Sequence, residues 1–570
     1  MNMPVTVEFR KKGHYWLDAG LVGLIKTIDK IDVSDISIYV DDSALKITGL
    51  PDKVQIALEA AYDRLVEDYY NVSSKRQIED TTSYNFYYDE QNDKFVAFPK
   101  RKAMGIAEMI YNKPPRPVGK SVKWIKKEKK DIVFNGKTVK KNRAILPQEY
   151  AHLQSRLDKF LDDNGLDITT AGMLINGPNE VRPKLKFSVV DKKSSGKKTL
   201  KACYLCGEES GQLEDANQTI FPLITGSSGV LSFNSCGGKP EKVCWRCSLL
   251  GKFVPASGFY MYQNDDLFIF LPYSISLEKM IYVHEKLQTL KNNTDPNLFS
   301  NFNHNLGSYI QHPYEATFAF LHSLYIQILT EKVASDDDGI LDFDAMWDLA
   351  LNKAPIEFFI IHTRKEGNTF SGKLFWIYRD SVYLFRLFDY LREKTGTPMR
   401  NILSILIDYS QKSNEAKTFI RNKVLERMLK KQSILELIEQ YVYHTDSKYF
   451  SPLFDMLLAY EKLLREGDTL YKEEQDAAVR LGRIIGMAVG KSPNGKKGDL
   501  FALRKCRKKT DFLEQINRLQ FKLGNELVIP NDVYEGKLTD KNFIEFKQFC
   551  MIAALNSFNY ITSQKEKNKE

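Results

Sequence analysis

Two short stretches, Cys203-Tyr-Leu-Cys206-Gly207 and Cys244-Trp-Arg-Cys247, carry the clearest structural signal in the sequence. Two residues between the cysteines of a pair let both thiolates reach one ion from a tight turn, and four thiolates complete the tetrahedral shell of zinc. The 37 residues between the pairs exceed the usual spacing. Doubling a loop costs only about 0.6 kcal/mol, however, whereas structural zinc supplies on the order of 10–16 kcal/mol. We therefore expect these four cysteines to hold one structural zinc.

A further cysteine, Cys236, lies eight residues before Cys244 and could in principle replace one ligand. Paired knuckles favour the outer four cysteines, so we expect Cys236 to remain unligated. A redox role for the Cys-x-x-Cys pairs is the alternative, but two pairs in one module fit a metal better. Because four cysteines leave no open coordination position, the expected zinc is structural rather than catalytic.

The composition indicates a folded protein of a reducing compartment. The chain has 570 residues, of which 43% are hydrophobic and 12% aromatic, so we expect it to fold into about three to five domains. Seven cysteines are too few for a disulfide scaffold. No window reaches the ~18 apolar residues of a membrane-spanning helix, and residues 1–12 contain no apolar signal core. The expectation is a soluble cytoplasmic protein without a membrane partner.

Basic residues gather in three stretches, although the net charge is only +9. Lys113–Arg143 holds twelve Lys or Arg and two acids, Lys192–Lys201 adds +5 without any acid, and Lys491–Lys509 carries eight basic residues and one acid. The remainder of the chain is acidic, with a balance of −13. Such a distribution is typical of proteins that bind polyanions; three solvated lysine-rich loops are the alternative.

The first and third stretches supply the candidate nucleic-acid contacts. Trp124 lies among lysines, where its ring could stack on or wedge between bases while the lysines bind phosphates. A Trp packed on its own domain is the alternative. The third stretch could follow the backbone of a single strand. The candidate residues are Arg116, Lys120, Lys123, Trp124, Lys126, Lys127, Lys129, Lys130, Lys137, Lys140, Lys491, Lys496, Lys497, Arg504, Lys505, Arg507, Lys508 and Lys509.

Hydrophobic periodicity predicts an α+β fold in which a mixed region precedes a helical bundle. Hairpins are expected at Asp41-Asp42, between Tyr84–Tyr88 and Lys94–Phe98, at Asn135-Gly136, at Gln263–Asp266 and around Gly367-Asn368. Helices are expected at Leu21–Ile31, Val54–Tyr70 and Gln148–Asp163, and a strand at Pro183–Val190. From about Ser381 apolar stripes recur at helical spacing, and Gly482 and Gly486 would allow close helix packing.

These patterns divide the chain into five expected parts. They are an N-terminal α/β domain (1–112), a basic linker with a hairpin and helix (113–200), the zinc module (201–250), a mixed α/β domain (251–380) and a helical bundle (381–570).

No motif in the sequence predicts a catalytic centre. Gly490–Lys497 nearly matches a P-loop, but Lys497 stands where the Mg²⁺-binding hydroxyl should be. Asp336–Gly339 looks like part of a calcium loop, yet alanines occupy its first and twelfth positions. The eight histidines form neither an HExxH motif nor an adjacent His-Asp pair. We therefore expect no catalytic residues and no enzymatic activity.

Three features together resemble the large subunit of type I CRISPR surveillance complexes (Cascade), most closely the CXXC–CXXC subfamily of type I-B systems. They are the Trp-Leu-Asp-Ala-Gly element at Trp16–Gly20, the two cysteine pairs, and the basic element Leu503–Lys509 in a helical C-terminal region. The resemblance spans the whole chain in architecture, but it rests on few motifs.

The resemblance implies a non-catalytic subunit of a crRNA-guided complex in antiviral defence. Such a subunit binds near the 5′ end of the guide, beside the guide-backbone and guide-5′-end subunits, and recognises the short duplex motif (PAM) next to the target. It then aids R-loop formation, contacts the target duplex and the displaced strand, and recruits a helicase-nuclease. There are two alternatives: an unrelated zinc-stabilised nucleic-acid-binding factor, and a metal-dependent nuclease or transferase.

The resemblance also implies a small helical subunit, which in related systems is sometimes translated from within the same gene. Met399, Met428 and Met456 precede helical segments and are candidate internal starts; ordinary internal methionines are the alternative.

Overall fold

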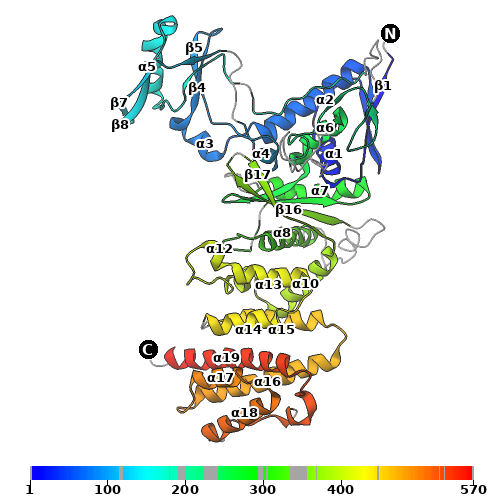
Figure 1. Cartoon of the computed structure of the whole chain (residues 1–570), viewed down its shortest axis with the longest axis vertical. Coiled ribbons are helices and arrows are strands. Elements are labelled where there is room, and N and C mark those ends of the chain that lie inside the picture. Colours follow the sequence, from blue (N-terminus) through cyan, green and yellow to red (C-terminus); the bar gives the residue numbers. More distant parts are fainter. Residues whose placement is uncertain are drawn as a thin grey trace. The chain divides into compact units, whose positions relative to one another are not determined.

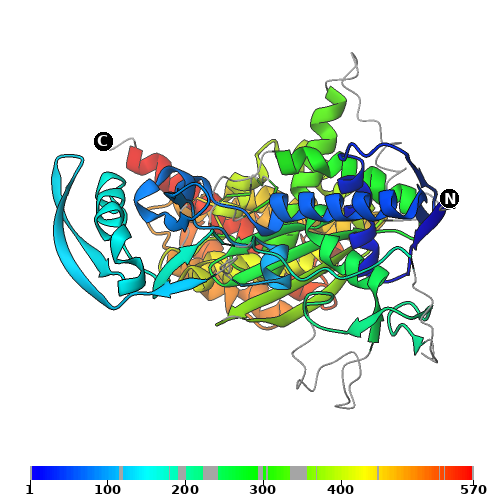
Figure 2. The same cartoon turned by 90° about the horizontal axis from the view of Figure 1, so that it is seen from above.

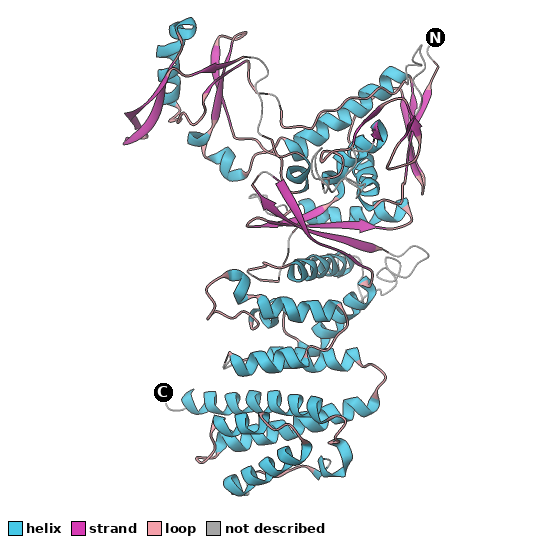
Figure 3. Cartoon of the chain, viewed as in Figure 1, coloured by secondary structure: helices cyan, strands magenta, loops and turns pink. Residues whose placement is uncertain are grey.

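The computed structural model of the chain describes residues 3–113, 120–178, 180–190, 201–222, 242–292, 300–302, 304, 306–307, 309–333, 356–367, 369–445, 449–524, 527–531 and 533–567. The fold is α+β, as predicted, with several sheets followed by a helical C-terminal region (Figure 1, Figure 3). The chain divides into two compact units. Unit 1 comprises Met1–Asn303 and Asp342–Arg379, and unit 2 comprises His304–Leu341 and Asp380–Glu570.

The N-terminal part of unit 1 is a three-stranded antiparallel sheet joined to helices by one apolar core. Alternation in the strands buries Val7, Phe9, Leu45 and Ile47 on one side, where they join the buried faces of the helices. The sheet has the order β1-β3-β2, with β1 (Val5–Arg10), β3 (Ala44–Gly49) and β2 (Ile36–Val40). The helices of this core are α1 (Tyr15–Ile28), α2 (Pro51–Leu65) with its π-helical end Val66–Tyr70, α4 (Ile106–Ile110) and α6 (Trp245–Ser257).

Helix α1 starts earlier than its periodicity predicted, and this changes the meaning of the Trp16–Gly20 element. His14 caps the helix by accepting hydrogen bonds from the Trp16 and Leu17 amides, so the element forms the first turns of α1. Gly20 therefore does not mark a turn that opens a helix. A β-carbon at Gly20 would lie 2.0 Å from the carbonyl oxygen of Leu250, so the backbones of α1 and α6 are in close contact there.

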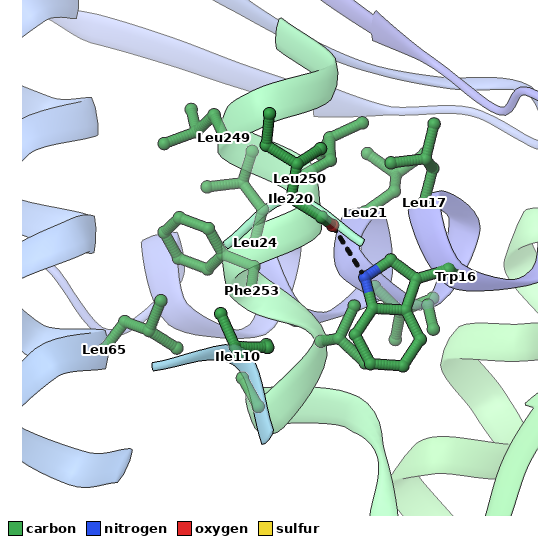
Figure 4. Packing of buried hydrophobic residues seen from close by; sticks show 14 of the residues in the cluster. Trp16, Leu17, Leu21, Leu24, Leu65, Ile110, Ile220, Leu249, Leu250 and Phe253 are labelled. Atoms are coloured by element: carbon green, nitrogen blue, oxygen red, sulfur yellow. Dashed lines mark hydrogen bonds between the residues drawn. The ribbon is translucent and has the colours of Figure 1, made fainter. Parts of the chain in front are cut away.

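The core between α1 and α6 also fixes the side chain of Trp16. Its indole N–H donates to the carbonyl oxygen of Ile220 at 3.0 Å, and the ring is fully buried among leucines of both helices (Figure 4). Asp18, also fully buried, accepts from the Lys12 amide at 2.7 Å and from the Lys11 ammonium at 3.1 Å. Trp16 and Asp18 of this element thus have a structural role in packing the connection between strand β1 and helix α1.

A second sheet with its own apolar core follows in sequence. Its order is β5-β4-β9-β6, with β4 (Asn85–Asp89), β5 (Lys94–Phe98), β6 (Ser121–Lys123) and β9 (Gly172–Ile175). A separate two-stranded ribbon pairs β7 (Lys126–Phe134) with β8 (Lys137–Ile145) and lies beside α5 (Gln154–Asp163), as Figure 2 also shows. The predicted hairpin at Asn135-Gly136 is confirmed. The helix expected from Gln148 starts instead with a 3₁₀ segment, Gln148–Leu153.

A third sheet completes unit 1 and confirms two further predicted hairpins. Its four antiparallel strands are β14 (Phe259–Gln263), β15 (Asp266–Tyr273), β16 (Glu357–Glu366) and β17 (Thr369–Tyr378), in sequence order. Helix α7 (Leu277–Asn292) follows β15, and α3 (Lys75–Glu79) and the 3₁₀ turn Thr81–Ser83 precede β4.

The segment Pro183–Val190, expected to be a strand, pairs with no strand in the described part of the chain. Side-chain amides satisfy part of its backbone instead: Gln212 Oε1 accepts from the Ser188 amide and Gln55 Oε1 accepts from the Val189 amide, each at 2.9 Å. Apolar and polar side chains alternate along this segment, but hydrogen bonds to two glutamine side chains replace those to a neighbouring strand.

The regular elements in the described residues of unit 2 are all helices. Its elements are α8 (Pro313–Val333), α10 (Ser381–Thr395), α11 (Met399–Ser404), α12 (Asn414–Lys417), α13 (Phe419–Leu429), α14 (Leu435–His444), α15 (Ser451–Leu464), α16 (Thr469–Lys491), α17 (Lys497–Arg504), α18 (Lys509–Leu523), the π-helical turn Val533–Lys537 and α19 (Phe543–Lys567). The predicted close packing at Gly482 and Gly486 is confirmed. β-Carbons there would lie 2.1 Å from carbonyl oxygens of Cys550 and Ala554 in α19.

Candidate metal centre

The first cysteine pair lies in a tight turn between two short strands, β10 (Lys201–Ala202) and β11 (Glu209–Ser210). The Gly207 amide donates to the carbonyl oxygen of Cys203 at 2.8 Å, and the Cys203 amide donates to Glu208 O at 2.8 Å. Gly207 has φ +73°, a conformation that glycine adopts without steric cost. The turn therefore directs the sulfur atoms of Cys203 and Cys206 toward one point.

The second pair lies where a strand passes into a helix. β12 (Leu213–Asp215) pairs with β13 (Lys242–Cys244), and Cys244 is the N-cap of α6, so Cys247 lies in the first helical turn. The Tyr204 amide donates to the carbonyl oxygen of Lys242 at 2.9 Å, which joins the two turns.

The four predicted ligands come together. Their sulfur atoms all lie within 4.8 Å of one another, and the Cys206 and Cys244 Sγ atoms are 3.8 Å apart. Sulfur atoms about 2.3 Å from a central zinc would be about 3.8 Å apart, so the cage has the size of a tetrahedral thiolate site. Cys203, Cys244 and Cys247 are buried, and Cys206 is half-buried. This group of four cysteines can bind a metal ion.

Hydrogen bonds within the cluster shift the pKa values of its thiols in opposite directions. Hydrogen bonds with Cys206, Cys244 and Cys247 lower the pKa of the Cys203 thiol, and hydrogen bonds with Cys203, Cys206 and Cys244 raise the pKa of the Cys247 thiol. The Cys244 amide also donates to Cys203 Sγ at 3.2 Å, which favours a thiolate there. Binding of a metal to all four sulfurs must therefore release protons.

Basic and aromatic side chains surround the cage. The Lys12 ammonium lies 2.6 Å from Glu208 Oε1; although burial opposes it, this hydrogen bond and the charge of Cys206 raise the pKa of Lys12. The Trp245 ring stacks on Phe187 with centroids 5.0 Å apart and meets the ring of Phe9 edge-on at 5.8 Å. The cage is thus anchored to the apolar core at the start of α6, the helix on which α1 packs.

Cys236 lies outside the described residues, as do Arg116 and the basic stretch 192–200. Their expected roles stay predictions.

The described residues of the first basic segment lie on β6, on the ribbon and in the connections around them. Two of its lysines are in ion pairs: Lys120 with Glu149 at 3.0 Å and Lys126 with Glu128 at 2.6 Å. The other candidates of this segment are exposed: Lys123, Lys127, Lys129, Lys130, Lys137 and Lys140.

Trp124 lies at the junction of β6 and β7, where it is partly buried against the apolar core of its own domain. Its indole N–H donates to the carbonyl oxygen of Thr170 at 3.0 Å, and its ring lies 6.3 Å from that of Phe86. A wedging role would require this hydrogen bond to break, so the packed alternative describes the side chain in this structure.

The third basic stretch runs from the end of α16 to the start of α18. Arg504 is held within unit 2: it forms an ion pair with Glu439 at 2.5 Å, and its guanidinium lies 4.7 Å from the Tyr443 ring centroid. Lys509 is 3.8 Å from Asp540, and Lys497 is half-buried. The others are exposed: Lys491, Lys496, Lys505, Arg507 and Lys508.

One polar cluster was not expected from the sequence. His362 Nε2 lies 2.6 Å from Asp266 Oδ1, and Arg364 binds the same carboxylate with two nitrogens, at 3.0 and 2.7 Å. Burial opposes ionisation of Asp266, but the hydrogen bonds from His362 and Arg364 lower its pKa to about 2. The cluster lies at one end of the paired strands β15 and β16. Because its members lie 96 and 98 residues apart in sequence, no local motif could have revealed it.

Comparison with protein-family models finds no matching family. A search of curated proteins also finds no significant match. Among the described residues, no helix is both long and apolar enough to cross a membrane.

Proposed function

We propose that this chain is the non-catalytic large subunit of a crRNA-guided DNA surveillance complex of the type I-B kind. The observation that carries the proposal is the four-cysteine cage, placed in sequence between a mixed α/β N-terminal region and a helical C-terminal region. Exposed lysines, among them Lys127, Lys129 and Lys140 of the ribbon and those of the α16–α18 connections, add the charge that a nucleic-acid partner requires.

We further infer that the metal is a structural zinc. Four sulfur ligands favour zinc over magnesium or calcium, which prefer oxygen. When bound, zinc would cross-link the two cysteine turns. Its role would be to fix the start of α6 and, through α6, the packing of the Trp16–Gly20 element.

In the proposed complex, base pairing between crRNA and target reads the sequence. The protein then needs contacts to phosphates and to a short duplex motif only. We assign to this chain recognition of that motif (the PAM), contacts near the guide 5′ end, help in opening the duplex, and recruitment of a helicase-nuclease. This assignment requires basic surfaces on a folded platform and gives the chain no catalytic step.

Co-purification from native cells tests the proposal. The full chain, carrying an affinity tag and expressed with its neighbouring genes, should retain a uniform RNA of a few tens of nucleotides together with a guide-backbone protein. Cells carrying the tag alone are the control. RNA of mixed lengths, or nucleic acid without such a protein, would instead support an unrelated zinc-stabilised nucleic-acid-binding factor. Hydrolysis of nucleic acid that depends on a divalent metal would contradict the non-catalytic assignment.

A further inference from the structure

The β7–β8 ribbon is a long sheet of only two strands. Each strand has nine residues, and the register pairs Lys126 with Ile145 through to Phe134 with Lys137. Asn135 and Gly136 form the turn with φ values of +51° and +73°, which suit a tight two-residue hairpin turn. At about 3.4 Å per residue the ribbon is about 30 Å long, close to one turn of a DNA duplex.

One face of the ribbon is committed to its own domain. Ile132 is buried on this face, and the ring of Phe134 lies over Gly165, where an added β-carbon would meet it at 2.7 Å. Arg143, on the same face, is 3% exposed and binds Asp162 of α5 with a nitrogen–oxygen distance of 2.6 Å. Helix α5 therefore supports the ribbon from this side.

The opposite face is open over most of its length. Because side chains alternate along a strand, this outward face carries Lys127 and Lys129 from β7 and Lys140 from β8, all exposed. Val133, 72% exposed, lies on the same face near the turn. Of the ribbon's own residues on this face one is acidic, Asp131 opposite Lys140, and Asp167 binds Asn142 at 3.0 Å, so the three lysines still leave a net positive charge.

We propose that the outward face of the ribbon docks into the major groove of a B-form DNA duplex, with Lys127, Lys129 and Lys140 on its phosphates. The B-form major groove, about 12 Å wide, admits a two-stranded ribbon, whereas the major groove of A-form RNA is deep and narrow. The identity of this duplex as the DNA beside the target rests on the proposed function. The docking itself rests on the ribbon's length, open face and charge.

Lysines on a two-stranded sheet have another possible use, because they keep open strand edges from pairing with other chains. That use does not depend on which face a lysine occupies. The inward-facing side of the ribbon also carries exposed lysines, at positions 126, 130 and 137. Although the sequence alone places these three lysines among the candidate contacts, their face makes them the ribbon's own control, of the same residue type and number; Lys126 among them is paired with Glu128.

The test compares two triple variants of the full chain, K127Q/K129Q/K140Q and K126Q/K130Q/K137Q. The probe is a labelled 30-base-pair DNA duplex of arbitrary sequence, titrated at several salt concentrations, alongside an RNA duplex of the same sequence. We expect the outward triple to weaken DNA binding by about tenfold or more and to reduce the salt slope by about 0.9 per lysine. The inward triple should change DNA affinity by no more than about twofold, and the RNA duplex should bind more weakly than DNA.

Equal losses from both triples, no loss from the outward triple, or equal affinity for both duplexes would overturn the proposal. Thermal unfolding of each variant excludes a folding defect as the cause of any loss. RNA co-purification separates this test from that of the proposed function. If the outward triple variant retains guide RNA but binds DNA as tightly as the wild type, only the ribbon proposal is contradicted. If DNA binding depends on the outward lysines but the chain carries no guide RNA, only the proposed function is contradicted.

Discussion

The four thiols of the cage depend on one another, because three sulfurs cannot complete the tetrahedral shell that four provide. Cys247 is the most deeply buried of them and belongs to the first turn of α6. We expect Cys247→Ser to lower the zinc content of the purified chain from one ion to near zero. Solubility should fall with it, and the midpoint of thermal unfolding should drop on the order of 10 °C. Elemental analysis and a melting curve on the same sample measure both effects.

Cys506→Ser is the matched control for this variant. Cys506 is half-buried and lies outside the cage, and its thiol donates to the Ala502 carbonyl oxygen at 3.6 Å. It should leave zinc content unchanged and the melting midpoint nearly so. If folded wild-type protein contained almost no metal, the assignment of a zinc site would be wrong.

Basic residues that look alike in sequence differ in what they contact. Arg143 and Arg504 belong to basic stretches, yet each is bound to a carboxylate of its own unit, Asp162 and Glu439 respectively. Breaking such partly buried pairs costs more than neutralising an exposed lysine. Net charge along the chain predicts a basic surface, but only burial and partners identify the cations that are available to a ligand.

Helices α16 and α19 pack through glycines spaced four residues apart. A methyl group at Gly486 would lie 2.1 Å from the carbonyl oxygen of Ala554, so the two backbones would have to separate. We expect Gly486→Ala to lower the free energy of unfolding by about 2–3 kcal/mol, measured by urea denaturation followed by circular dichroism. Gly498→Ala is the control. That position in α17 has no atom within 4 Å of an added β-carbon, so the change should be neutral or stabilise by up to about 1 kcal/mol. Equal stability of the two variants would contradict the packing.

Sequence patterns predicted those helices, strands and turns that are stabilised by interactions between residues close together in sequence. Alternation around Asn135-Gly136 predicted a hairpin because the turn and its two strands are adjacent in sequence. The four-cysteine cage was predictable because each pair carries its own spacing. The α1–α6 contact at Gly20 and the Asp266–His362 pair join residues far apart in sequence, and Gln55 lies 134 residues from Val189, whose amide it accepts from. Such contacts arise only once the chain has folded.

Many of the contacts between the C-terminal helices lie after Met428, although α15 also packs on α10 and the Tyr441 hydroxyl donates to the carbonyl oxygen of Ile405. Tyr443 donates to the carbonyl oxygen of Met551 at 2.9 Å, Arg504 binds Glu439, and α16 packs on α19. A product that starts at Met428, in the last turn of α13, would keep these contacts and the whole of α14 to α19. A start at Met456 would remove α14 and the first part of α15, and with them Tyr443 and Glu439, the partners of Met551 and Arg504.

We therefore expect the native gene to yield, besides the full chain, a small helical subunit that starts at Met428. With a C-terminal tag it should appear as a second band of about 16 kDa, since 143 of the 570 residues remain and the full chain has 65.7 kDa. The band should vanish on Met428→Leu, a change of similar volume that a buried methionine tolerates at less than about 1.5 kcal/mol, so the full-length band should persist. Met487→Leu, on the exposed side of α16, is the control and should leave both bands. A single full-length band, whichever of Met399, Met428 and Met456 is replaced, would show that these are ordinary internal methionines.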